Sequence, residues 1–290
     1  MHPSVILREQ MELQGLVRLM AAHSPLSARL VAEAGFDGIW ASGFELSALY
    51  GLPDASLITM TQHLEMVRAM AGQCRLPILA DLATGFGNAI NVLQAIELYE
   101  QAGAAGVVLE DKTFPKMTSL AGNARQELVR VEEFQGKIEA ALTARRDPSF
   151  LVIARTEALI AGLGIPEALR RAAAYAAAGA DLILVHSKQP TPMEVENFIH
   201  QWKSRQPLVL VPTSYPELTE KRIRESGKVK MVIYGNHAIR ASVQAMQRVF
   251  ARIIADGGSE NIQSDIASVE EIFRLQNMPR LRENERRFLR

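Results

Sequence analysis

Four charged side chains follow a short apolar run in the middle of the chain. The run spans residues 106–109, and the residues that come after it include Glu110, Asp111, Lys112 and Lys116. An apolar run of this length predicts a buried strand. Because ligands of parallel sheets collect where such strands end, these carboxylates and lysines are candidates for a functional site.

The same pattern recurs along the chain, where short β-rich runs alternate with stretches of helical length. The expected strands are residues 16–22, 38–41, 77–82, 106–109, 150–154, 181–185, 208–211 and 229–234. Ser24 and Pro25 predict a helix start, and Gly35, Gly103 and Gly179 predict helix ends. Eight such units in 290 residues favour a (β/α)8 TIM barrel, with an open doubly wound sheet as the alternative.

A polar residue stands at or just after the end of every expected strand. These residues are His23, Ser42, Asp81, Glu110, Arg155, His186, Thr213 and Asn236. In a barrel, the ends of all the strands converge on one mouth. We therefore expect a site there, whereas His63 and His200 fall inside helical stretches and receive no role.

The carboxylates among these strand-end residues are candidate metal ligands. Asp81, Glu110 and the nearby Asp54 are hard oxygen donors, which favour Mg²⁺ or Mn²⁺. The alternative is that Glu110 forms a structural ion pair with Lys112 or Arg155. Arg155 can bind a carboxylate or phosphoryl group in a bidentate manner, and His186 can donate or relay a proton.

Composition excludes several classes of partner. Basic and acidic residues both number 32, so no net charge favours nucleic acid or an anionic membrane. The single cysteine, Cys74, rules out an internal disulfide and suits a reducing cytoplasm. No signal peptide is recognisable, and no apolar run reaches the roughly 20 residues that span a bilayer. We expect a cytoplasmic protein that binds a small molecule and further copies of itself.

The chain continues beyond the eighth strand–helix unit. We expect residues 1–290 to form a single barrel domain with residues 264–290 as a C-terminal helical extension. Ser268 and Glu271 predict a capping box there, followed by an apolar helix face. A closed barrel does not need this helix, so we expect it to pack against a second subunit.

Several phrases of the sequence resemble the phosphoenolpyruvate mutase and isocitrate lyase superfamily. They are GIWASGFELSA, ADLATGFGN, EDKTFPKMTSL, IARTEALIAGLG, ILVHSKQ, LVLVPTSYP, VIYGNHAIRASV and SVEEIFRLQ. They follow one another in register over nearly the whole chain. The resemblance implies a (β/α)8 barrel whose last helix is swapped with a neighbouring subunit, in a homodimer or homotetramer.

The residues from Lys116 to Ser119 distinguish branches of this superfamily. Its lyases carry a catalytic cysteine in this loop and its mutases an asparagine, whereas the hydrolase branch carries threonine, as this chain does at Thr118. The resemblance therefore implies Mg²⁺-dependent hydrolysis of the C–P bond of phosphonopyruvate to pyruvate and phosphate. The alternatives are mutase chemistry and C–C cleavage or decarboxylation of an oxaloacetate-like 2-oxo acid.

The resemblance also implies roles for individual residues. Asp81 would bind the metal directly, while Asp54 and Glu110 would hold its waters; Mn²⁺ or Co²⁺ could replace Mg²⁺. The implied catalytic residues are Lys116, Thr118, Arg155 and His186, and the implied substrate-binding residues are Trp40, Ser42, Gly43, Phe44, Ser119, Arg155 and His186.

Three positions depart from the patterns of the superfamily. Ala83 stands where the motif Asp-x-Asp-Thr-Gly has its second aspartate, Ala41 where glycine is usual, and Met117 where the hydrolase branch has aspartate. We expect Ala83 to weaken metal binding or to change the substrate, which leaves a metal-poor, non-catalytic member as a further alternative. Ala41 and Met117 are expected to narrow the pocket.

Overall fold

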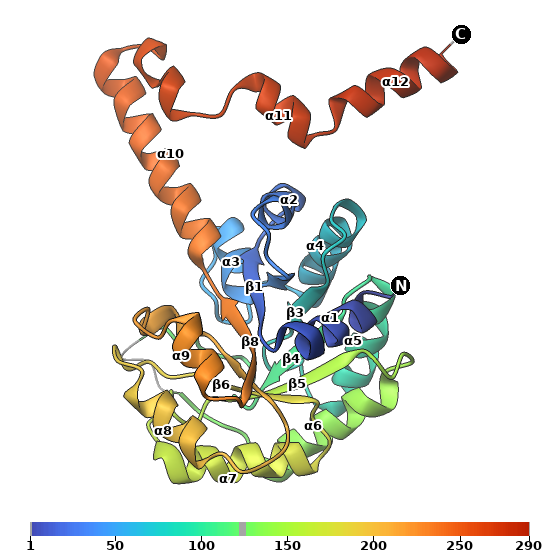
Figure 1. Cartoon of the computed structure of the whole chain (residues 1–290), viewed down its shortest axis with the longest axis vertical. Coiled ribbons are helices and arrows are strands. Elements are labelled where there is room, and N and C mark those ends of the chain that lie inside the picture. Colours follow the sequence, from blue (N-terminus) through green and yellow to red (C-terminus); the bar gives the residue numbers. More distant parts are fainter. Residues whose placement is uncertain (1, 122–125, 290) are drawn as a thin grey trace. The chain divides into compact units, whose positions relative to one another are not determined.

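Eight apolar segments form parallel strands that close into a barrel (Figure 1). The strands are β1 (Val17–Ala22), β2 (Gly38–Ala41), β3 (Ile78–Asp81), β4 (Gly106–Glu110), β5 (Leu151–Thr156), β6 (Leu182–Val185), β7 (Leu208–Leu210) and β8 (Val229–Tyr234). The computed structural model describes residues 2–121 and 126–289. Each strand pairs with the next, and β8 pairs with β1. The (β/α)8 prediction is confirmed, and the open-sheet alternative is wrong.

Helices precede, connect and follow the strands. They are α1 (Pro3–Gln14), α2 (Pro25–Glu33), α3 (Gly43–Leu49), α4 (Met60–Gln73), α5 (Ala89–Gln101), α6 (Val131–Ala144), α7 (Gly164–Ala177), α8 (Met193–Gln201), α9 (Glu220–Glu225), α10 (His237–Asp256), α11 (Val269–Leu275) and α12 (Met278–Phe288). Short 3₁₀ turns cover Pro212–Ser214 and Glu260–Asp265. Ser24 caps α2 through a hydrogen bond from Ser27 N, as the sequence predicts. The three predicted helix-ending glycines all have a positive φ.

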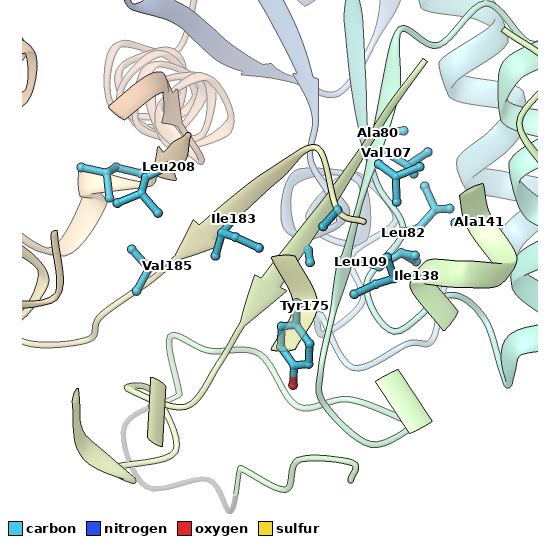
Figure 2. Close-up of a cluster of buried hydrophobic side chains, with 14 of the residues drawn as sticks. Ala80, Leu82, Val107, Leu109, Ile138, Ala141, Tyr175, Ile183, Val185 and Leu208 are labelled. Carbon is cyan, nitrogen blue, oxygen red and sulfur yellow. The ribbon is translucent and has the colours of Figure 1, made fainter. Parts of the chain in front are cut away.

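Alternation along the strands divides the core into two parts, because successive side chains point to opposite faces. The outward part packs under the helices, and Figure 2 shows Val107 and Leu109 of β4 with Ile138 of α6 in this cluster. The inward part fills the barrel. Leu7 and Met11 of α1 belong to this inner cluster, so the unpredicted first helix packs against the barrel interior.

The chain divides into two compact units, one up to residue 237 and the other from residue 238. The second unit contains most of α10 together with α11 and α12. Ser268 caps α11 by accepting a hydrogen bond from Glu271 N, while the Glu271 carboxylate pairs with Arg274. The division into a 1–290 barrel domain and a 264–290 extension stays a prediction. Residues 122–125 of the segment 111–128, like residues 1 and 290, lie outside the described residues.

No helix in the described part of the chain is long and apolar enough to cross a membrane.

His63 makes the stability of the barrel depend on pH. It is buried on α4 with its Nδ1 2.8 Å from the Tyr99 hydroxyl, and burial lowers its pKa from 6.5 to about 4. Between pH 6.5 and about pH 4, His63 binds a proton in the unfolded chain but stays neutral in the folded protein. The contribution of neutral His63 is therefore fully present above pH 6.5 and is lost as the pH falls toward 4, by about 3 kcal/mol.

We expect His63→Gln, which cannot titrate, to lose less stability than the wild type when the pH falls from 7 to 4.5. Urea unfolding at both pH values measures the difference. His200→Gln removes an exposed histidine of α8 and is the control, which should behave like the wild type. Equal losses in the wild type and His63→Gln would show that His63 does not carry this dependence.

Candidate active site

The inward register of the strands continues into polar residues at their carboxyl ends. Side chains two residues apart on a strand share a face. On β5 the inward Ile153 is followed by Arg155, and on β6 the inward Leu184 is followed by His186 just past the strand end. The layer above the apolar barrel core is therefore polar, and it forms the floor of a cavity at the mouth.

This cavity has a volume of about 60 Å³. It is lined by Trp40, Ser42, Phe44, Asp54, Asp81, Lys116, Thr118, Ser119, Leu120, Arg155, His186, Val211, Thr213, Gly235 and Asn236. Six of the eight strand-end residues predicted from the sequence are among them. His23 is not, because its Nδ1 lies 2.8 Å from a buried carboxylate oxygen of Glu45. Glu110 is not a lining residue either, although it contacts two residues that are.

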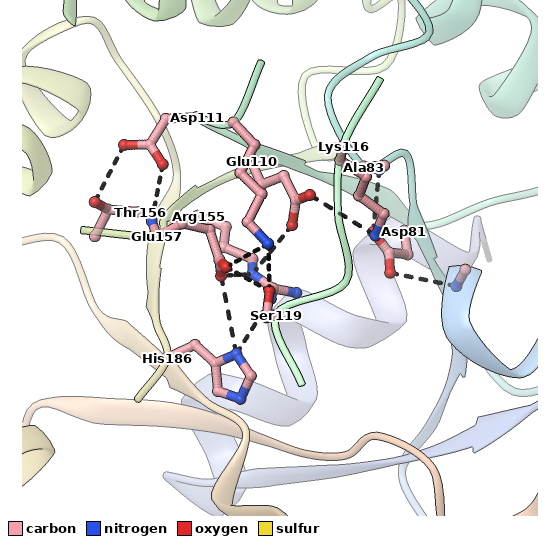
Figure 3. Close-up of polar contacts among 12 residues, drawn as sticks. Asp81, Ala83, Glu110, Asp111, Lys116, Ser119, Arg155, Thr156, Glu157 and His186 are labelled. Atoms are coloured by element: carbon pink, nitrogen blue, oxygen red, sulfur yellow. Dashed lines mark hydrogen bonds and ion pairs between the residues drawn. The ribbon is translucent and has the colours of Figure 1, made fainter. Parts of the chain in front are cut away.

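Asp81 ends β3 with both carboxylate oxygens oriented by backbone N–H groups. Oδ2 accepts a hydrogen bond from Gly43 N at 3.3 Å, and Oδ1 accepts one from Ala83 N at 3.1 Å (Figure 3). Gly43 allows this approach, because a Cβ there would stand 3.3 Å from Asp81 Oδ2 and 4.0 Å from Asp54 Oδ1. The carboxylates of Asp81 and Asp54 thus approach the same small space beside the first turn of α3.

Lys116 neutralises the two remaining carboxylates of the predicted metal set. Its Nζ lies 3.2 Å from Asp54 Oδ1 and 3.7 Å from Glu110 Oε1. Burial disfavours the ammonium ion, but Glu110, Asp54 and Asp81 together raise the pKa of Lys116. Both carboxylate oxygens of Glu110 are buried without a hydrogen-bond partner, although Oε2 lies 3.4 Å from Arg155 Nε. Glu110 therefore has oxygens that can still accept hydrogen bonds from bound waters.

This donor set fits a hydrated hard cation better than a fully protein-ligated one. Within the described ranges, no three histidine, cysteine, aspartate or glutamate side chains are placed to hold a metal ion together. Mg²⁺ usually keeps several waters and takes only one or two carboxylates. A second cavity of about 20 Å³, large enough for a water, lies beside Asp81, Asp54 and Ala83. Asp81 can bind such an ion directly, with Asp54 and Glu110 holding its waters.

Arg155 and His186 form the positive, hydrogen-bond-donating side of the cavity. An Arg155 terminal nitrogen lies 3.1 Å from His186 Nδ1. Because a guanidinium can only donate, Nδ1 must accept, and a neutral His186 then carries its hydrogen on Nε2. Burial lowers the pKa of His186 and favours this neutral form, and it outweighs the opposing effect of the Glu157 carboxylate, whose Oε1 lies 3.8 Å from Nδ1. Nε2 is buried without a partner, so its hydrogen is available to a bound ligand.

Glu157 is a central residue of the site that the sequence analysis did not identify. It is fully buried and accepts hydrogen bonds from Arg155 Nε at 2.6 Å and from Ser119 Oγ, with Lys112 Nζ 2.9 Å away (Figure 3). Burial alone would raise the pKa of its carboxyl, but Arg155 and Lys112 hold that pKa well below its ordinary value. The sequence signal that could have identified Glu157 is its position as a charged residue directly after the last residue of β5.

Residues 112–120, called the lid here, cover the cavity from the loop between β4 and α6. Lys112 Nζ donates to Met117 O at 2.9 Å and to Ser119 Oγ at 2.6 Å, which folds the lid back on its own base. Lys116 N donates to Ser56 Oγ at 3.1 Å. Lys116, Thr118 and Ser119 of the lid line the cavity. These three residues of the predicted site therefore lie beside Asp81, Arg155 and His186.

The structure does not support the expectation of a narrowed pocket. Met117 is 43% exposed, and Ala41 belongs to the outward cluster under the helices. Neither residue lines the cavity at the mouth.

A methyl group at position 43 should disturb the carboxylate pair. We expect Gly43→Ala to weaken Mn²⁺ binding about tenfold, because its Cβ would press on Asp81 Oδ2. Mn²⁺ titration followed by electron paramagnetic resonance measures this. Gly72→Ala is the control, since a Cβ at Gly72 in α4 meets nothing within 4 Å. Unchanged Mn²⁺ affinity in Gly43→Ala would contradict a cation site at this position.

Known proteins resemble this chain in both sequence and fold. A family model described as phosphoenolpyruvate phosphomutase matches residues 7–254. The chain is 56% identical to phosphonopyruvate hydrolase of Variovorax sp. (strain Pal2), over 98% of each chain. It is 44% identical to phosphoenolpyruvate phosphomutase of Tetrahymena pyriformis, over 98% of this chain and 94% of that one.

Solved structures agree with these relatives. A crystal structure of phosphonopyruvate hydrolase in complex with oxalate and Mg²⁺ matches all of both chains, with a TM-score of 0.95 and 54% identity. The phosphoenolpyruvate phosphomutase from Streptomyces platensis subsp. rosaceus matches with a TM-score of 0.96 and 48% identity, again over all of both chains. A barrel with these strand ends, this lid and this degree of identity to its relatives belongs to the phosphoenolpyruvate phosphomutase family.

Proposed function

We propose that this chain is an Mg²⁺-dependent enzyme that hydrolyses the C–P bond of phosphonopyruvate to pyruvate and phosphate. One observation carries the proposal: the cavity is polarised, with carboxylates at Asp81 and Asp54 and hydrogen-bond donors at Arg155 and His186. Such a cavity matches a ligand that combines a cation-chelating 2-oxo acid with a phosphoryl group. The 56% identity to a phosphonopyruvate hydrolase supports the same substrate.

The carboxylates form the cation end of the site. Asp81 would bind the cation directly, while Asp54 and Glu110 would accept hydrogen bonds from its waters. Mg²⁺ held there would supply positive charge that favours the enolate of pyruvate. Mn²⁺ and Co²⁺ are candidate replacements for Mg²⁺ at this site. The relative solved with oxalate and Mg²⁺ supports this cofactor.

The first turn of α3 holds the pyruvoyl end of the substrate. The substrate carboxylate is assigned to the backbone around Ser42 and Gly43, beside the Gly43 N–H that donates to Asp81 Oδ2 at 3.3 Å. Trp40 and Phe44 contribute apolar surface to the same end of the cavity.

Arg155 and His186 bind the phosphoryl end. The guanidinium of Arg155 donates to Glu157 at 2.6 Å, and Nε2 of His186 is buried without a hydrogen-bond partner. These donors offset the negative charge that gathers on the phosphoryl oxygens as the bond to carbon breaks. Ser119 stands beside Arg155, with its Oγ 3.0 Å from a guanidinium nitrogen.

The lid positions the attacking water. Lys116 and Thr118 both line the cavity, so a water between them and the phosphoryl group lies on the lid side. That water forms the new P–O bond while the electron pair of the C–P bond passes to carbon, and the resulting enolate takes a proton to become pyruvate. A seated lid also keeps bulk water away from the enolate.

Incubation of the enzyme with phosphonopyruvate and Mg²⁺, followed by ³¹P NMR, tests this function directly. We expect the phosphonate signal to convert into inorganic phosphate, and we expect EDTA to stop the conversion until Mg²⁺ is restored. A phosphoenolpyruvate signal would show mutase chemistry instead, and loss of CO₂ from oxaloacetate alone would show a decarboxylase.

Ala83→Asp is the companion variant in this assay. If the wild type is inert and the variant gains Mg²⁺-dependent turnover, the wild-type chain is a metal-poor binding protein rather than a hydrolase. If both are active, the site functions without a carboxylate at position 83.

The C-terminal helices supply a surface for self-association, and we propose a homodimer or homotetramer formed by exchanging them. On α10, the exposed apolar side chains Val243, Met246 and Phe250 recur at helical spacing, and on α11 Val269 and Phe273 are exposed as well. Apolar faces of this extent mark interaction sites. The proposed location is the cytoplasm, which suits a chain whose only cysteine is the free Cys74.

A charge in the apolar stripe of α10 should weaken the assembly. We expect the wild type to sediment as a dimer or tetramer and Phe250→Glu to shift toward monomer at the same concentration. Ile90→Glu changes an exposed apolar residue of α5 and should leave the assembly intact. Monomeric wild-type protein across a concentration series would overturn the proposed exchange.

A further inference from the structure

Glu157 connects the lid to the phosphoryl-binding side of the cavity without lining the cavity itself. Its Oε1 accepts from Arg155 Nε at 2.6 Å. Its Oε2 accepts from Ser119 Oγ and lies 2.9 Å from Lys112 Nζ. One buried carboxylate therefore contacts a phosphoryl-binding residue and two lid residues at the same time.

The backbone of Glu157 is held in place independently of the lid. Its N–H donates to Asp111 Oδ1 at 2.8 Å. The other oxygen of Asp111 accepts from the hydroxyl of Tyr175 at 2.7 Å and from Arg171 Nη1 at 3.2 Å. Because Asp111 follows β4 and these two residues lie on α7, the anchor belongs to the barrel. Glu157 is thus a fixed point against which the lid is seated.

Ser119 uses its full hydrogen-bonding capacity in this arrangement. A hydroxyl has one hydrogen to donate and two lone pairs to accept with. Ser119 Oγ donates to Glu157, and it accepts from Lys112 Nζ at 2.6 Å and from Arg155 Nη2 at 3.0 Å. Arg155 thus has Glu157 and His186 as partners from the barrel and Ser119 as a partner from the lid.

Without Ser119, Arg155 would lie between competing carboxylates. Glu110 Oε2 stands 3.4 Å from the same Nε atom that Glu157 Oε1 holds at 2.6 Å. Ser119 Oγ, at 3.0 Å, and His186 Nδ1, at 3.1 Å, together hold one terminal nitrogen of the guanidinium and so set the plane in which its donors point. A guanidinium binds a phosphoryl group well only when that plane is correct.

We propose that Glu157 is a positioning residue that makes the phosphoryl-binding orientation of Arg155 depend on a seated lid, through their shared contact with Ser119. This inference rests on the proposed function for its kinetic consequences, but not for the contacts themselves. Arg155 presents its donors correctly when the lid is seated. When Ser119 leaves, the terminal nitrogen keeps only His186 as a partner, and Glu110 competes with Glu157 for Nε. Phosphoryl binding and lid closure then favour each other.

Glu157→Gln keeps the size of the side chain but places an amide donor among the donors of Arg155 and Lys112. We expect kcat to fall about a hundredfold, as misplacement of a binding group can cause. Inhibition by inorganic phosphate should weaken about tenfold, whereas inhibition by oxalate with Mg²⁺ should change less than about twofold, because oxalate lacks a phosphoryl group. Unchanged phosphate inhibition would overturn the proposal.

Asp37→Asn is the matched control. Asp37 is a buried carboxylate that accepts from Arg18 Nε at 3.0 Å, but it precedes β2 and lies at the opposite end of the barrel. This variant should lower the thermal midpoint while leaving kcat and phosphate inhibition unchanged. Asp37→Asn therefore distinguishes the general effect of losing a buried ion pair from the specific effect of losing the orientation of Arg155.

Ser119→Ala approaches the same contact from the lid and leaves every buried charge in place. We expect it to weaken phosphate inhibition as well, and we expect the double variant with Glu157→Gln to be no worse than the more severe single variant. Residues that act as one unit show such non-additivity. Effects that multiply would mean that the two residues act separately. If Glu157→Gln does not fold, Ser119→Ala alone decides, since unchanged phosphate inhibition in it would refute the coupling.

A measurement without substrate keeps this test separate from the test of the proposed function. Tryptic cleavage after Lys112 and Lys116 reports release of the lid, because both side chains are buried in the seated lid. We expect faster cleavage in Glu157→Gln and Ser119→Ala but not in Asp37→Asn. If phosphonopyruvate is not hydrolysed by the wild type, the proposed function fails while this measurement still applies. Cleavage at the wild-type rate in both Glu157→Gln and Ser119→Ala would contradict the inference.

Discussion

Compensation of buried charge at the mouth of the barrel is the constraint on which the rest of the structure depends. Glu110 and Glu157 are at most 1% exposed, and Lys112, Lys116 and Arg155 are each less than a tenth exposed. An isolated ion at such a depth would be strongly destabilising, so each charge needs a partner of opposite sign. The strands fix one set of partners and the lid supplies the other, and the site is complete only when both are present.

This constraint explains why so many polar residues converge without disrupting the fold. The apolar interior of the barrel lies beneath the charged layer and not within it, since the inward register changes from aliphatic to polar residues only at the strand ends. The anchors of the charged layer are hydrogen bonds to backbone and to helix α7, such as Asp111 with Tyr175. Side chains held in this way keep their orientation before a ligand arrives, which reduces the reorganisation that binding would otherwise require.

The barrel and most residues at its mouth could be predicted from the sequence, because the strand ends follow from apolar runs and a barrel brings them together. Asp81, Arg155 and His186 were found in this way. Glu157 was not, because it lies one residue beyond β5 and its importance comes from partners distant in the sequence. The sequence places His63 inside a helical stretch, but periodicity cannot show that it borders the cavity beside Asp81. The first helix was missed although Leu7 and Met11 have helical spacing.

The packing of Leu7 and Met11 against the inner cluster has a consequence for traffic through the site. In the described part of the chain, α1 and the inward side chains fill the barrel below the cavity, so the lid side is the route by which solutes reach it. The ligand therefore enters and the product leaves through the same opening on the lid side. Each turnover then requires ligand entry, lid closure and product release through the same opening, and the slowest of these steps can limit the rate of turnover.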